Sequence, residues 1–178
     1  MASPRAMAAS QGTLMPVGAS SWSFTEDDFG AITQALQRFL FDSNARCALI
    51  VDRSGQLVTT VGDRPDFDAT AFATLTAADF SANAQLAKLI GETDFNTLFH
   101  QGERESMLLA DVARRVILVV LFDNRATLGL VRLKMRQAVE ELTKLFEQVF
   151  ARDAQRPTGA PPPGLLAGAE DEIDKLFQ

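Results

Sequence analysis

Residues 116–122, VILVVLF, are apolar at every position, and this run constrains the fold more than any other stretch of the chain. A strand with one face in water alternates apolar and polar residues, whereas a strand covered on both faces reads as a continuous apolar run. We therefore expect a central strand, with helices packed over both faces of its sheet.

Four further strands are expected on either side of the second helical segment. The stretch RCALIVDRSGQLVTTVG, residues 46–62, contains two β-rich runs divided by Arg53, Ser54 and Gly55, which is typical of a hairpin. Residues 95–124 predict three strands with turns near Gly102 and Ala113, and the apolar run is the last of them. The sheet should have five strands and be mainly antiparallel.

Three helices are expected around this sheet. The first begins after Thr25, a candidate N-cap with Asp28 three residues later, and its apolar residues recur at helical spacing. The second covers residues 70–90 and the third residues 127–150. VRLKMR, near the start of the third, alternates like a strand, but the spacing from Met135 onward is helical. The order helix, strand, strand, helix, strand, strand, strand, helix predicts an α+β sandwich.

The second helix, TAFATLTAADFSANAQLAKLI, is rich in alanine and carries small or apolar residues around most of its circumference. A helix of this kind is usually buried on more than one side. It could be a core helix packed by its own chain, or its second face could pack against another subunit. The sequence leaves both interpretations open.

We divide the chain into four parts by composition. Residues 1–22 are expected to be a disordered extension and residues 23–152 the folded domain, followed by a Pro- and Gly-rich linker at 153–167. Residues 168–178 carry four acids and one lysine, and a helix there would place Ile173, Leu176 and Phe177 on one face. This segment is too short to be stable alone and predicts a ligand for a groove on a partner. A disordered end with accidental patterning is the alternative.

Catalytic and metal sites find little support. The chain has one histidine, His100, and one cysteine, Cys47, which lies in an apolar run and should be buried and unreactive. Zinc lacks ligands, and Asp63, Asp66 and Asp68 fit a capped loop better than a calcium loop. No glycine-rich phosphate-binding motif is present. We expect no catalytic residue, cofactor or metal, and an enzyme using His100 is a minor alternative.

Net charge and cysteine content limit the kinds of binding partner and the cellular compartment that we expect. A formal net charge of −6 disfavours general binding to nucleic acid, which needs a basic surface. A single cysteine fits a reducing compartment, and no run is long enough for a membrane span. The first 22 residues lack the apolar core of a signal peptide, so we expect a cytoplasmic protein.

Basic residues gather in one stretch that runs into the third helix, where Arg125, Arg132, Lys134 and Arg136 precede the first acids of that helix, Glu140 and Glu141. They could form an ordinary solvated helix face. They could also form a docking surface for an acidic partner, which would be either another protein or the acidic C-terminal segment of this chain.

Three stretches resemble the bacterial roadblock/LC7 family, specifically the subgroup that acts on the Ras-like GTPase MglA. They are ALIVDRSGQLVTTVG, LTAADFSANAQLAKLIGETDFNTLFHQGE and RVILVVLFDNRATLGLVRLKMRQAVEELTKLFE, and the likeness resumes at DEIDKLF. QLAKLIGE, HQGE and LVVLFDNRATLGLVRL are specific to this subgroup, and the similarity covers about residues 25–150.

The resemblance implies a homodimer in which second helices pack together and third strands meet edge to edge. It also implies binding of an MglA-like GTPase and faster GTP hydrolysis in cell polarity or motility control, with no catalytic group supplied by this chain. The expected GTPase contacts are Ser81, Gln85 and Lys88, with help from the first helix, and Arg132, Lys134 and Arg136 are further candidate contacts. The C-terminal segment is expected to reach a second site on the GTPase and to act on nucleotide exchange. Enrichment at a cell pole would follow from such partners.

The second helix departs from the subgroup's pattern, because Phe80 and Gln85 stand where small residues are expected. Bulky residues there would weaken GTPase docking or alter partner choice. This motivates an alternative function, a dimeric scaffold that recruits partners without activating hydrolysis.

Overall fold

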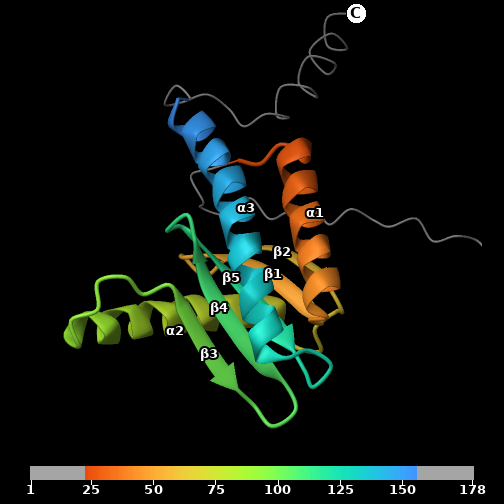
Figure 1. Ribbon diagram of the computed structural model, residues 1–178. Helices are drawn as coiled ribbons and strands as arrows, with labels where there is room; N and C mark the ends of the chain where they lie inside the picture. Colours follow the sequence, from red (N-terminus) through yellow and green to blue (C-terminus); the bar gives the residue numbers. More distant parts are fainter. Residues whose placement is uncertain (1–22, 156–178) are drawn as a thin grey trace, which may run out of the picture.

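The computed structural model describes residues 23–155 (Figure 1). The predicted N-terminal extension, nearly all of the linker and the predicted C-terminal helix lie outside these residues. The elements in chain order are α1 (Glu26–Ser43), β1 (Cys47–Asp52), β2 (Leu57–Gly62), α2 (Ala69–Leu89), β3 (Thr97–Gln101), β4 (Ser106–Val112), β5 (Val116–Phe122) and α3 (Leu128–Ala154). This is the predicted order.

The five strands form one antiparallel sheet in the order β2-β1-β5-β4-β3. The apolar run is β5, which lies at the centre with Val119 paired to Leu49 of β1 and to Leu109 of β4. All three of these residues are fully buried. The prediction of a central strand covered on both faces is confirmed.

Helices cover the two faces of the sheet unequally, with α1 and α3 side by side on one face and α2 crossing the other (Figure 1). The first face holds the larger core, in which Leu36, Met135 and Phe146 are buried over β5. The second core is smaller, with Ala77 and Phe80 of α2 packed over the central strands. The predicted α+β sandwich with helices on both faces is confirmed.

Local sequence signals set the helix ends. Thr25 and Asp28 form a capping box, with the Thr25 hydroxyl accepting from the Asp28 amide and the Asp28 carboxylate accepting from the Thr25 amide. Thr127 caps α3 through its hydroxyl, which accepts from the Leu130 amide at 3.3 Å. Because this cap starts the helix, VRLKMR is helical, and α3 runs on to Ala154, two residues past the expected domain boundary.

β3 lies at one edge of the sheet and pairs only with β4 among the described strands. Three of its five residues are exposed. A strand edge with free amide and carbonyl groups can pair with another chain. The position of β3 is therefore the one that the expected edge-to-edge dimer requires.

Candidate functional site

The outward face of α2 presents apolar side chains that no other part of the described chain covers. Leu75, Leu86 and Leu89 are 69%, 58% and 82% exposed. With the exposed Ala78 and Ala82 they follow one another at spacings of three or four residues and so form a single stripe. An exposed apolar stripe on a helix usually marks a protein interface.

This stripe points away from the sheet, because the buried residues of α2 lie on its opposite side. Ala73 and Ala77 are buried, and Phe80 is 1% exposed, with its ring 5.0 Å from that of Phe95 and the Arg53 guanidinium 5.6 Å from its centre. Phe80 is thus a core residue and does not lie on the outward face. Of the two bulky departures, only Gln85 can alter a surface that a partner touches.

Ser81, Gln85 and Lys88 are all exposed and lie on one face of α2, next to the apolar stripe. The structure therefore brings these three predicted contact residues together. A partner docked there would also lie beside the stripe.

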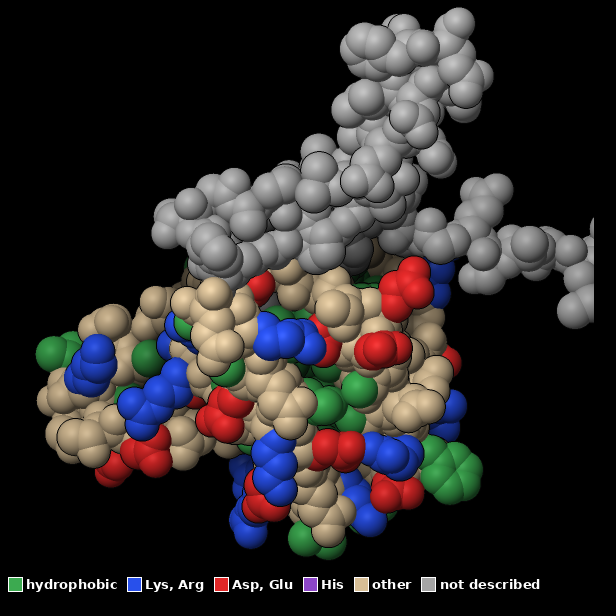
Figure 2. Space-filling view, turned by 90° about the horizontal axis from the view of Figure 1, so that it is seen from above, with side chains coloured by type: hydrophobic (Ala, Val, Ile, Leu, Met, Phe, Trp, Pro, Cys, Tyr) green, Lys and Arg blue, Asp and Glu red, His purple; other side chains and the backbone are tan. Residues whose placement is uncertain are grey.

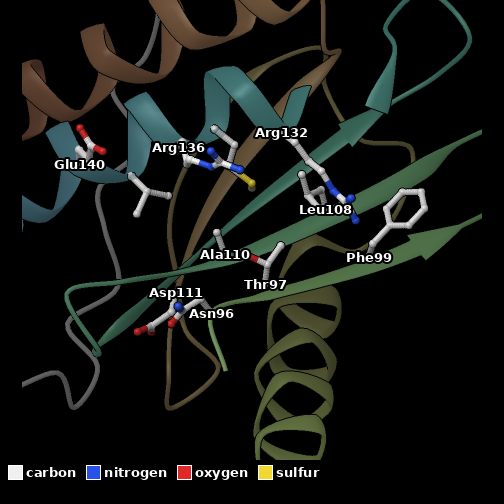
Figure 3. Close-up of a pocket in the computed structure, with 11 residues that line it drawn as sticks. Asn96, Thr97, Phe99, Leu108, Ala110, Asp111, Arg132, Arg136 and Glu140 are labelled. Carbon is white, nitrogen blue, oxygen red and sulfur yellow. The ribbon is translucent and has the colours of Figure 1, made fainter. Parts of the chain in front are cut away.

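The three predicted cations of α3 lie on the opposite side of the sheet from α2, and they do not act as one patch. The ammonium nitrogen Nζ of Lys134 lies 3.3 Å from Oδ2 of Asp42, so this side chain turns toward α1. Arg132 and Arg136, one helical turn apart, instead line a groove beside β3 (Figure 3). The two predicted sets therefore lie on opposite faces of the sheet within one subunit.

Charges elsewhere are mixed in sign. In the space-filling view, Lys and Arg side chains alternate with Asp and Glu over the surface seen (Figure 2). Opposite charges also pair between elements of the described chain. Arg38 of α1, for example, pairs with Glu141 of α3. This face shows no extended basic field of the kind that nucleic-acid binding needs.

Cys47 is buried in β1, as predicted. Burial raises the pKa of its thiol to about 11, and the nearby carboxylates of Asp63 and Glu105 add to the rise against the opposing effect of Arg46. Since the thiolate is the nucleophilic form, the group is a thiol at neutral pH and serves as part of the core.

His100 lies on β3, and its Nε2 is 2.8 Å from Oδ2 of Asp79 on α2. The pair is about half exposed and ties the edge strand to the helix that crosses beneath it. His100 and Cys47 thus have different surroundings, one in a partly exposed hydrogen bond and the other in the core.

The acidic loop before α2 uses its carboxylates locally. Asp68 caps the helix by accepting from the amides of Thr70 and Ala71, at 2.9 and 3.2 Å. Asp63 accepts from Nε of Arg46 at 3.2 Å. The predicted capped loop is confirmed, and within residues 23–155 no cluster of three or more potential ligands could hold a metal ion.

Sequence reasoning identified the two-faced character of α2 but did not single out its outward leucines. The signal was present in their spacing, and it becomes readable once Ala73, Ala77 and Phe80 are known to face the sheet. The groove beside β3 gave no such signal, because residues far apart in sequence, such as Phe99 and Met135, form it together.

A five-stranded antiparallel sheet in this order, with two helices on one face and a third on the other, is the arrangement expected of a roadblock-type α+β domain. Residues 32–122 match the Roadblock/LC7 domain family. The chain belongs to that family.

Several relatives are similar over most of the described domain. The structure of MglB from Myxococcus xanthus is 45% identical, with a TM-score of 0.65, and the match covers 67% of this chain and 98% of that one. The gliding protein MglB from Thermus thermophilus is 31% identical, with a TM-score of 0.67 over 72% of this chain and 97% of that one. The uncharacterized protein MJ1340 of Methanocaldococcus jannaschii is 34% identical over 79 residues, or 44% of this chain and 68% of that protein. The resemblance to the MglB type is confirmed.

No helix among residues 23–155 is long and apolar enough to cross a bilayer.

Proposed function

We propose that this chain is a homodimeric regulator that binds an MglA-like small Ras-type GTPase and stimulates its GTP hydrolysis. The observation that carries the proposal is the 45% identity to MglB over nearly the whole of that protein. The setting would be control of cell polarity or gliding motility, in the cytoplasm, with enrichment at a pole through partners.

Two features of the structure support the dimer. The apolar stripe of α2 would be covered if two copies packed through this helix, and burying each exposed leucine would contribute roughly 1.5–3 kcal/mol. The edge of β3 would be covered by pairing with a second β3, which extends the sheet across both subunits.

In this proposal the GTPase docks on Ser81, Gln85 and Lys88, which adjoin the dimer stripe. Activation would arise because the dimer binds best to the GTPase conformation in which the catalytic groups of the GTPase itself are aligned. This differs from activation by an arginine finger inserted in trans. The regulator would then be no enzyme itself.

The test is GTP turnover by the MglA-like GTPase of the same genome, with and without the full chain. We expect stimulation by the wild-type chain and little by Lys88→Glu, which places a negative charge on the docking face. Lys144→Glu makes the same charge change at an exposed position on α3 and should leave stimulation intact. Equal stimulation by both variants would show that the GTPase does not dock on this face of α2.

The scaffold function is the second candidate, and exposed Gln85 on the docking face is the observation that favours it. Binding without any stimulation by the wild-type chain would establish this candidate instead. The C-terminal residues Ile173, Leu176 and Phe177 remain a predicted second contact with the GTPase, acting on nucleotide exchange; they lie outside the described residues.

A further inference from the structure

A groove of about 680 Å³ lies between α3 and the β3 edge of the sheet, on the face opposite α2. Its floor is apolar and comes from two directions, with Phe99, Leu108 and Ala110 rising from the strands and Met135 and Val139 facing them from α3. Figure 3 shows these strand residues lying below the arginines of α3. Phe99 and Val139 are partly exposed and can contact apolar side chains of a ligand, whereas Leu108, Ala110 and Met135 are buried, and the exposed polar residues Asn96 and Thr97 complete the lining.

Two cations on the rim are available to a ligand. The Arg132 guanidinium lies 5.8 Å from the centre of the Phe99 ring, and Arg136 follows one turn later. Neither pairs with a carboxylate among residues 23–155, whereas Arg38 and Lys134 on the α1 side are both paired. At the other end of the groove, Glu140 is exposed and Asp111 is paired with Arg53.

We propose that this groove binds residues 168–178 of the same chain, GAEDEIDKLFQ, as a short amphipathic helix. The segment matches the groove in its apolar residues and in its charge. Ile173, Leu176 and Phe177 would share one helix face and cover the apolar floor, while four acids against one lysine meet the unpaired arginines. An 11-residue helix is marginal alone and needs such a surface.

The chain between is long enough for this contact. α3 ends at Ala154, and along the helix axis Arg132 lies 23 residues before Gln155, or about 35 Å at 1.5 Å per residue. Residues 156–167 include three consecutive prolines and would span about 37 Å if extended at 3.1 Å per residue. The segment can therefore fold back along α3 and reach even the far end of the groove.

Charge matching also sets the direction of the segment. Its acids at 170–172 come before Lys175, and in the groove Arg132 and Arg136 come before Glu140. A segment running parallel to α3 pairs acid with arginine and lysine with glutamate, whereas the reverse direction opposes like charges. Residue 178 should accordingly lie toward the end formed by Asn96, Asp111 and Glu140.

A second copy of the chain fits this groove less well. Pairing at the β3 edge uses backbone groups in the plane of the sheet, and the apolar stripe of α2 lies on the other face, while the groove opens above that plane on the α3 side. Docking of the segment requires no GTPase. If the GTPase also takes this segment, as proposed above, the groove is the place from which it must be released.

The test uses the full chain with a spin label at Gln178→Cys. Labelling is selective because Cys47 is buried and its pKa is about 11. We expect the label to broaden the amide signals of residues 96–99 and 139–140 more strongly than those of α2. The double variant Arg132→Glu with Arg136→Glu should restore the broadened signals, and so should Leu176→Ala with Phe177→Ala.

A matched control is Arg64→Glu with Arg104→Glu, which changes the net charge equally at exposed sites outside the groove and should leave the broadening unchanged. A mixture of unlabelled isotopic chain with labelled ordinary chain tests for transfer between copies and should show weaker broadening at the groove than the labelled isotopic chain shows. Absence of broadening at the groove in the labelled chain, broadening on α2 instead, or broadening in the mixture as strong as in the labelled chain would each overturn the proposal.

Discussion

At the scale of single residues, backbone geometry limits the chain as strongly as side-chain chemistry does. Gly62 ends β2 with a φ of 99°, and a Cβ built on it would lie 2.3 Å from the carbonyl oxygen of Arg46 and 2.8 Å from Cδ1 of Leu40. Gly30 is the opposite case, an exposed helical glycine with no atom within 4 Å of such a Cβ. The two positions give a matched pair for one substitution.

We predict that Gly62→Ala lowers the free energy of unfolding by roughly 1–3 kcal/mol, since alanine at positive φ is strained and its methyl group meets backbone. Gly30→Ala should raise the free energy of unfolding by about 0.5–1 kcal/mol, because alanine favours a helix. Urea denaturation of both variants checks this. A shift in the same direction for both would contradict the geometry.

At the scale of elements, the sequence predicted every helix and strand in order, because caps and apolar spacing act locally. Thr25, Thr127 and Gly55 each lie where a helix begins or a hairpin turns. The sequence alone could not predict which helix ends contact each other in the folded domain. Asp28 at the start of α1 pairs with Arg152 near the end of α3, a contact between residues 124 positions apart that depends on the packing of the two helices.

The pKa of Asp28 is a consequence of this contact. Burial alone would raise it, but hydrogen bonds from Arg152 and from Thr25 outweigh burial, and the pKa is lower than that of a free carboxyl. A lowered pKa in the folded state contributes stability above the unfolded pKa of about 4. That contribution is lost as the pH falls through the folded pKa.

We therefore predict that Asp28→Asn has a lower melting temperature than the wild type at pH 7 and that the difference narrows as the pH falls below about 4. Thermal unfolding followed by circular dichroism across this pH range measures it. Asp27→Asn removes an exposed carboxylate of the same turn and should show a smaller difference at pH 7. If the difference in melting temperature between wild type and Asp28→Asn grew in acid, the pKa of Asp28 would not be lowered by folding.

At the scale of the whole molecule, the two faces of the sheet differ in what covers them and in the surface that they present. One face holds the larger core and the groove, and the other holds α2 with its outward stripe. The sequence predicted the contact residues of α2 as one group, and they do lie together. It also grouped Arg132, Lys134 and Arg136, but a helix separates neighbours two residues apart, so Lys134 faces α1 and its two neighbours face the groove.

We predict that Leu86→Glu with Leu89→Glu shifts the proposed dimer to monomer, because two charges would enter the proposed apolar contact between α2 helices. The dimer dissociation constant should rise at least about tenfold, as each buried leucine contributes more than 1.4 kcal/mol. Sedimentation equilibrium measures the mass against 19.4 kDa for one chain.

The control for this experiment is Phe41→Glu, which removes an 88% exposed apolar side chain from α1 on the other face. It should leave the mass unchanged. If Phe41→Glu dissociates the dimer while the α2 variant does not, the subunits meet through the α1 face.

The central position of β5 has a consequence for how the chain reaches its native state. VILVVLF has no charge and no proline, the composition of a segment that self-associates when exposed. Its partner β1 is made about 65 residues earlier, so this pairing closes a long loop and should form slowly. Arg114, Arg115 and Asp123 flank the strand and act as gatekeepers during that interval. In the folded domain Leu121 is partly buried and the other six residues of the strand are buried, so the strand is most exposed to self-association in the nascent chain.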